Sequence, residues 1–157
     1  MLDKMQYPSI FQIGIVVPDA KTAAEKASRI FGLPIVEESY FGTHGGYEHC
    51  NTQYMGKPTD GSGHNYLLKF GQVDVEFIEP VGDEPSIWKD YLVDHPKGGI
   101  HHMAWLVHDT EKTTEFLASQ DTPKVGEGVW ETGRYTYYDT KEMGFFMEAL
   151  EYFDREY

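Results

Sequence analysis

The feature that most constrains this chain is an internal repeat. At an offset of 90 residues, the segment 12–19 (QIGIVVPD) aligns with 102–109 (HMAWLVHD), so that an apolar run, a turn and an Asp suited to cap a helix coincide. At an offset of 72, the segment 75–79 (VEFIE) aligns with 147–151 (MEALE), and each has the form apolar-Glu-apolar-apolar-Glu. Repetition of one supersecondary unit predicts two similar modules that share a core.

Each module begins with a strand-like run followed by a helical one. In the first module the run 12–17 precedes a helix with Asp19 as its N-cap and Gly32 as its C-cap. Its expected apolar face consists of Ala20, Ala23, Ala24, Ala27, Ile30 and Phe31. In the second module the strand 102–107 precedes a helix at 109–119.

Further runs give each module most of a β-α-β-β-β pattern. Strands are expected at 66–70, 72–80, 135–138 and 144–150, and a helix is expected at 84–95. We therefore predict one α+β domain over residues 1–157, with module one at about 9–80, a connecting segment at 81–98 and module two at about 99–152. The two modules would pair their strands into a partly closed, mixed β-sheet cavity with flanking helices.

One stretch fits neither periodicity. Residues 41–64 hold six of the 16 glycines and three of the seven histidines. This composition predicts a long loop, and long loops in compact domains are often lids or binding loops. A tolerated insertion is the alternative.

The acidic balance of the chain restricts its partners. The 157 residues contain 13 Lys plus Arg against 26 Asp plus Glu, and this net charge of −13 repels nucleic-acid backbones and anionic lipids. The single cysteine, Cys50, cannot form an intramolecular disulfide, residues 1–10 lack the apolar core of a secretory signal, and no apolar run approaches a membrane span. We expect a cytoplasmic protein that acts on a small molecule and binds neither nucleic acid nor membranes.

Four polar residues stand at equivalent places in the two modules. Gln12 and His102 lie in the first strands, and Glu76 and Glu148 lie in the last strands. If the modules pair about a pseudo-twofold axis, the four side chains converge on one point, where a divalent cation would meet one nitrogen and at least three oxygens. Each residue alone also has an ordinary interpretation, because Gln12 and Glu76 suit a solvated strand face and a core histidine is often structural.

Glu148 is the hardest of the four to explain without a site. Its strand is apolar on both faces, and no Lys or Arg lies within the strand to pair with it. A buried, unpaired carboxylate costs several kcal/mol or must be neutralised. Coordination to a cation resolves this cost, while a proton held at neutral pH and a distant Arg such as Arg134 are the alternatives.

The segment 99–109 (GIHHMAWLVHD) is similar to the opening of the second module of methylmalonyl-CoA epimerases. The tandem arrangement, from about residue 9 to residue 152, resembles the wider vicinal oxygen chelate superfamily of glyoxalases, bleomycin-resistance proteins and dioxygenases. This resemblance implies that the metal ligands are Gln12, Glu76, His102 and Glu148. One imidazole, two carboxylates and an amide oxygen suit one Zn, Ni, Co, Mn or Fe(II) ion with open positions for substrate.

The residues also depart from both enzyme families. The epimerases usually have His first and Gln second among the ligands, whereas the set Gln, Glu, His, Glu is similar to that of some glyoxalase I enzymes. Val16 stands where those enzymes hold glutathione with a positive residue, and the additional base of the epimerases falls near Leu67 or Leu68. The resemblance therefore favours neither glutathione nor methylmalonyl-CoA as substrate.

Together these features predict a metal-dependent isomerase, epimerase or lyase of glyoxalase type. It would act through an enediolate on a small α-oxygenated carbonyl compound or thioester, with Glu148 as the base and Glu76 as the second candidate. The expected substrate contacts are Tyr135, Tyr137 and His64. An Fe(II) ring-cleaving dioxygenase and a metal-free binding protein are the alternatives, and the resemblance implies a homodimer.

Overall fold

Ten strands form one mixed sheet in the computed structural model, in the order β2-β5-β6-β1-β7-β10-β9-β8-β3-β4. The structure describes residues 2, 4–5, 9–42 and 51–155. The strands are β1 (Gln12–Val16), β2 (Ile35–Phe41), β3 (Asn51–Tyr54), β4 (Lys57–Pro58), β5 (Ser62–Phe70), β6 (Val73–Val81), β7 (Gly99–Leu106), β8 (Lys124–Trp130), β9 (Gly133–Tyr138) and β10 (Phe146–Tyr152). The helices are α1 (Ala20–Phe31), α2 (Ile87–Asp94) and α3 (Thr110–Ala118), and a 3-10 turn, η2, spans Lys141–Met143.

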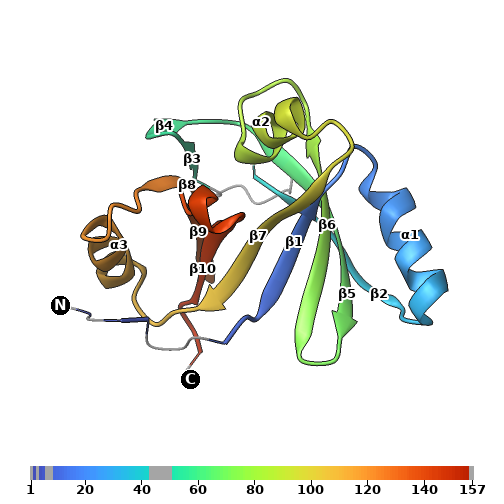
Figure 1. Ribbon diagram of the computed structural model, residues 1–157, viewed down its shortest axis with the longest axis horizontal. Helices are drawn as coiled ribbons and strands as arrows, with labels where there is room; N and C mark the ends of the chain where they lie inside the picture. Colours follow the sequence, from blue (N-terminus) through green and yellow to red (C-terminus); the bar gives the residue numbers. More distant parts are fainter. Residues whose placement is uncertain (1, 3, 6–8, 43–50, 156–157) are drawn as a thin grey trace.

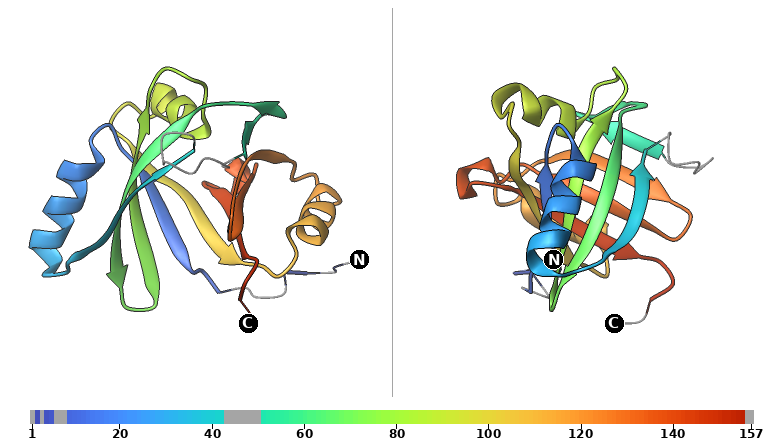
Figure 2. Two further views of the ribbon diagram at one scale, coloured as in Figure 1. Left: turned by 180° about the vertical axis from the view of Figure 1, so that it is seen from behind. Right: turned by 90° about the vertical axis from the view of Figure 1, so that its right-hand side faces the viewer.

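The centre of the sheet is the junction of the two modules. β1 pairs antiparallel with β7, and each of these strands pairs in parallel with the last strand of its own module, β6 or β10. The repeated elements thus run β1-α1-β2-β5-β6 and then β7-α3-β8-β9-β10, with β3 and β4 between β2 and β5 and with α2 between β6 and β7. The sheet is strongly curled, with α1 and α3 on opposite outer sides (Figures 1 and 2). The predicted tandem α+β fold is confirmed.

Matching caps begin the two outer helices. The carboxylate of Asp19 accepts a hydrogen bond from the backbone N–H of Thr22 at 2.9 Å, and Asp109 accepts one from Lys112 at the same distance. An Asp at the N-cap satisfies a backbone donor that the helix leaves free. This matching geometry follows from the repeat at an offset of 90 residues.

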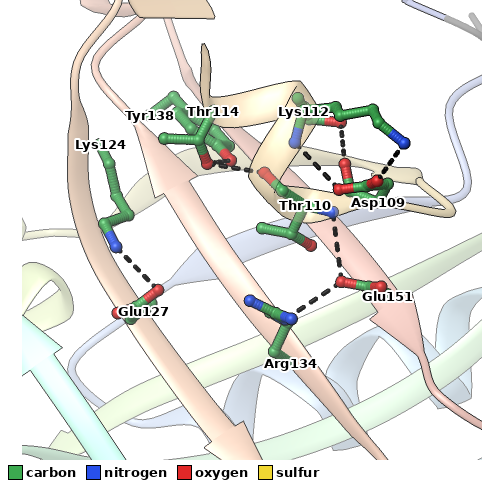
Figure 3. Close-up of polar contacts among 10 residues, drawn as sticks. Asp109, Thr110, Lys112, Thr114, Lys124, Glu127, Arg134, Tyr138 and Glu151 are labelled. Carbon is green, nitrogen blue, oxygen red and sulfur yellow. Dashed lines mark hydrogen bonds and ion pairs between the residues drawn. The ribbon is translucent and has the colours of Figure 1, made fainter.

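A second equivalent carboxylate anchors each helix to its sheet. Glu79 accepts a hydrogen bond from the backbone N–H of Ala20 at 2.9 Å, and Glu151 accepts one from Thr110 at 3.2 Å. Glu151 also pairs with Arg134 at 3.0 Å, as Figure 3 shows. The second Glu of each apolar-Glu-apolar-apolar-Glu run therefore has a structural role, and Arg134 pairs with Glu151 instead of Glu148.

The predicted apolar face of the first helix is partly wrong. Ala20, Ala24 and Ala27 are buried in a cluster with β5, but Ile30 and Phe31 are 66% and 61% exposed. Small alanine side chains bring the first turns of α1 close to the sheet, whereas its last turn extends beyond the buried cluster.

The prediction of a loop over 41–64 is also partly wrong. The strands β3 and β4 form a hairpin within it, and β5 already begins at Ser62. β3 is polar and lacks the alternating pattern of a typical strand. Its pairing with β8, which belongs to the other module and is distant in sequence, stabilises it. Residues 43–50 lie outside the described part of the chain.

The connecting helix is shorter than predicted. α2 begins at Ile87 because Ser86 is its N-cap, accepting a hydrogen bond from the backbone N–H of Lys89 at 3.0 Å. Trp88 in its first turn is buried in the core between the modules. None of the helices in the described residues has the length and apolar character that a membrane span requires.

Candidate active site

The strand register brings the four repeat-related residues to one face of the central sheet. In one row across the sheet, Glu76 of β6 pairs with Gly14 of β1, which pairs with His102 of β7. A Cβ on Gly14 would overlap the imidazole ring of His102. The absence of a side chain at residue 14 therefore provides the space for the ring of His102.

In the neighbouring row the two modules exchange roles, so that module one contributes the central-strand side chain and module two contributes the carboxylate. Gln12 of β1 pairs with Ala104 of β7, which pairs with Glu148 of β10. Residues two apart on a strand share a face, so these side chains project to the same side as those of the first row. The two modules thus each contribute one residue from a central strand and one carboxylate from a flanking strand.

All four side chains are buried. Gln12, Glu76, His102 and Glu148 are between 0% and 7% exposed. Nε2 of His102 lies 3.2 Å from Oε2 of Glu148 and 3.6 Å from Oε2 of Glu76. Within the described part of the chain, neither Nε2 of His102 nor Oε2 of Glu148 has a well-oriented hydrogen bond. The structure thus brings His102 and the two predicted carboxylates together.

Burial and neighbouring charges shift the pKa values of Glu76 and His102. Burial raises the pKa of Glu76 to about 7, and the charge of Glu148 adds to this effect while His102 opposes it. Burial disfavours the charged form of His102, but the carboxylates of Glu148 and Glu76 outweigh it and raise the pKa of His102 to about 9. Groups with perturbed pKa values that meet in a cavity are typical of functional sites.

His101 contacts the Nδ1 atom of the His102 ring, on the side away from the carboxylates. The Nδ1 atoms of the two imidazoles lie 2.9 Å apart, and His101 is only 1% exposed. Burial lowers the pKa of His101 well below its usual range, and the neighbouring His102 adds to this effect. A neutral His101 can accept the Nδ1 proton of His102, which leaves Nε2 of His102 directed at the carboxylates.

The donor set fits a divalent cation. Two buried carboxylates face at most one positive imidazolium, so a cation would balance the excess negative charge, and its natural donors are Nε2 of His102 and the Glu oxygens. Gln12 adds an amide oxygen on the same face. Within the described ranges, no three His, Cys, Asp or Glu side chains already converge as a formed metal cage.

A cavity of about 590 Å³ opens beside these residues. Three of the four, Gln12, Glu76 and Glu148, line it, as do Tyr135 and Tyr137. Buried Trp88 donates a hydrogen bond from its indole N–H to the hydroxyl of Tyr137 at 3.3 Å. Burial raises the pKa of Tyr137 well above its usual range, and Glu148 adds to this effect. Tyr137 is therefore a neutral polar group beside the carboxylates.

The structure places His64, the other expected substrate contact, outside the lining of this cavity. Its Nε2 lies 2.9 Å from Oε1 of Glu38, and its Nδ1 lies 3.5 Å from Oε1 of Glu79. The ring also stacks on Tyr40 at 4.1 Å between centroids. His64 is one residue out of phase with the cavity-facing positions of β5, because neighbouring strand residues face opposite sides.

Three features of the site were not predicted. The supporting role of His101, the space at Gly14 and the aromatic wall that includes Trp130 all depend on packing between strands. Gly14 did leave a signal, since a glycine inside a strand pattern often marks a close approach.

Comparison with known proteins identifies the family of this chain. Residues 11–138 match the family model described as the Glyoxalase/Bleomycin resistance protein/Dioxygenase superfamily. The chain belongs to this superfamily. That assignment confirms the resemblance drawn from the repeat.

Relatives of this superfamily member include epimerases. A mitochondrial methylmalonyl-CoA epimerase from Dictyostelium discoideum is 22% identical over 132 residues, which cover 80% of this chain and 69% of that protein. The crystal structure of methylmalonyl-CoA epimerase from Mycobacterium tuberculosis matches 96% of this chain and 92% of its own, with a TM-score of 0.65 and 21% identity. A variant of the Streptomyces coelicolor methylmalonyl-CoA epimerase, in complex with 2-nitronate-propionyl-CoA, matches 97% of this chain and 99% of its own, with a TM-score of 0.68 and 16% identity. At these identities the solved structures support the fold.

Proposed function

We propose that this protein is a divalent-metal-dependent isomerase or epimerase that moves a proton at a carbon next to a carbonyl group. The substrate is a small α-oxygenated carbonyl compound or thioester. The similarity to methylmalonyl-CoA epimerases supports an epimerase or isomerase type of activity.

The observation that carries the proposal is the buried group formed by His102, Glu148 and Glu76, with distances of 3.2 and 3.6 Å from the imidazole to the two carboxylates. A structural role alone would not require two adjacent buried acids beside an open cavity. His102, Glu76, Glu148 and Gln12 would hold the cation. When bound, the cation supplies Lewis acidity toward the substrate oxygens, which favours the charge of an enediolate.

The two carboxylates lie on one face of the sheet, within 3.6 Å of the same imidazole nitrogen of His102. They come from β6 and β10, which flank the central strands β1 and β7. Glu148 is the proposed base that removes the α-proton, and Glu76 is the second candidate. Return of the proton to the opposite face of the carbon would invert its configuration.

The experiment is a metal analysis followed by a proton-exchange screen. Purified protein should bind about one equivalent of Zn²⁺, Ni²⁺, Co²⁺, Mn²⁺ or Fe²⁺. The loaded protein should then exchange the α-hydrogen of a 2-hydroxy carbonyl compound or an acyl thioester in deuterated water, detected by proton NMR. Failure to bind any of these ions would overturn the metal-dependent function and favour a metal-free binding protein.

The assembly and location expected from the sequence stay predictions. We propose a homodimer in the cytoplasm, which sedimentation and cell fractionation would test.

A further inference from the structure

Part of the cavity lining is a cluster of aromatic side chains. Trp130 stacks against Tyr135 with centroids 6.2 Å apart and an interplanar angle of 28°, and Phe41 and Tyr137 pack on Tyr135 at 6.2 and 5.6 Å. All four line the same cavity, together with Tyr152. Aromatic side chains bind flat, apolar groups through stacked or edge-on contacts.

The charges in the cavity do not favour a polyanion. Among the described residues, its charged lining consists of four carboxylates and two cations, namely Glu37, Asp74, Glu76, Glu148, Lys69 and Arg155. A divalent cation at the site would only balance this excess of negative charge. Lys69 pairs in register with Asp74, and the guanidinium of Arg155 lies 4.1 Å from the centroid of the Tyr152 ring.

A coenzyme A thioester carries several phosphate charges and needs a basic surface near the mouth of its cavity. This chain has a net charge of −13, and the two cations of the lining already have an acidic or an aromatic neighbour. Repulsion by a surface of the same sign slows association and weakens binding.

We infer that the substrate is a compact, uncharged molecule with an aromatic ring beside its α-oxygenated carbonyl, and that it is not a coenzyme A thioester. This inference rests on the proposed function and specifies its substrate class. The oxygens lie toward His102, Glu76 and Glu148, while the ring lies against Trp130 and Tyr135.

The reaction on such a molecule is balanced without a co-reactant. The carboxylate takes the α-proton, the electron pair of the C–H bond forms the new C=C bond, and the carbonyl π pair moves to oxygen. Return of a proton to the same carbon, from the other face, restores the carbonyl and gives the opposite stereoisomer.

The test compares three probes on the metal-loaded protein. (R)-Benzoin is an uncharged α-hydroxy ketone with aromatic rings, acetoin has the same reacting group without a ring, and methylmalonyl-CoA carries the phosphates. Loss of the α-hydrogen in deuterated water is followed by proton NMR. We expect kcat/KM for (R)-benzoin to exceed that for acetoin at least tenfold, with no detectable exchange of methylmalonyl-CoA.

Two variants report on the aromatic wall. Trp130→Leu should lower kcat/KM for (R)-benzoin at least tenfold and leave that for acetoin within twofold. Trp105→Leu is the matched control, because Trp105 packs near Phe145 and lies outside the cavity lining. This variant should leave kcat/KM for both probes unchanged, and circular dichroism checks that the variant is folded.

The possible outcomes distinguish the proposed substrate class from the proposed proton-transfer function. Fastest exchange with methylmalonyl-CoA, or equal exchange of acetoin and (R)-benzoin, would overturn the substrate class and leave the proton-transfer function intact. Exchange with none of the probes by a protein that binds its cation would overturn both. Binding of (R)-benzoin, followed by tryptophan fluorescence, should also change less than twofold between low and physiological salt, because an uncharged ligand is not screened.

Discussion

Gly14 and His102 face one another across the junction of the two modules, and the imidazole of His102 occupies the space that a Cβ at residue 14 would need. Gly14 also pairs with Glu76 on its other side. The position of the imidazole beside the Glu76 carboxylate therefore depends on a residue that has no functional group of its own.

Replacement of Gly14 by alanine should move the ring of His102 away from Glu76 and Glu148. We expect the Gly14→Ala protein to bind divalent cations at least tenfold more weakly and to unfold at a lower temperature, because the overlapping atoms belong to a packed ring. Isothermal titration with Zn²⁺ or Ni²⁺ measures the affinity. Gly126→Ala is the matched control, since a Cβ on this strand glycine has its nearest neighbour at an ordinary 3.5 Å. Wild-type affinity in Gly14→Ala would contradict this account.

The repeat explains why so much of the site could be predicted from the sequence. Once residues 12 and 102, and 76 and 148, are known to be equivalent, pairing of β1 with β7 brings their side chains to one face. This reasoning needs only the strand period and the pseudo-symmetry.

The repeat could not predict the contacts of residues that have no counterpart in the other module. β3 joins the sheet by pairing with β8, a contact between distant parts of the sequence. His64 was an expected substrate contact, but strand phase turns it toward Glu38 and Glu79. Ile30 and Phe31 continue the helical pattern of α1 beyond the region that the sheet covers.

The two carboxylates should each be required for cation binding and for exchange. Glu148→Gln and Glu76→Gln keep the shape of the side chain and remove its charge, so we expect at least tenfold weaker binding of Zn²⁺ and at least a hundredfold slower α-proton exchange. Glu127→Gln is the control, because Glu127 pairs with Lys124 at 3.0 Å outside the cavity lining. Full exchange activity in Glu148→Gln would exclude Glu148 as the base and leave Glu76 as the candidate.

The stability of the metal-free protein should fall as the pH rises. The pKa of Glu76 is raised from 4.5 to about 7 and that of His102 from 6.5 to about 9, so the folded protein holds both protons more tightly than the unfolded chain. The contribution of Glu76 is present below its unfolded pKa and is lost as the pH rises through about 7. That of His102 is lost as the pH rises through about 9.

Thermal unfolding of chelator-treated protein measures this effect. Between about pH 5.5 and about pH 9.5, we expect Tm to fall by roughly 5 °C or more, a shift that corresponds to a few kcal/mol in a chain of this length. Glu76→Gln removes one of the two titrating groups and leaves the other charges of the protein unchanged. The Tm of this variant should therefore vary less over the same pH range. A wild-type Tm that stays constant or rises would contradict the protonation states assigned to the site.

His101 should act as a positioning residue for His102. Their Nδ1 atoms lie 2.9 Å apart, so His101 can accept the Nδ1 proton of His102 and keep Nε2 available to a cation. Partners of this kind typically change metal affinity by about 10- to 100-fold. We expect His101→Leu to weaken Zn²⁺ binding by that factor, whereas His101→Asn, which keeps an acceptor, should restore most of it. Nitrogen-15 NMR of His102 at about pH 10, above its raised pKa of about 9, should show the Nδ1–H form in wild type and Asn variants and a mixture in the Leu variant. Equal affinity and an unchanged tautomer in His101→Leu would show that His101 only fills space.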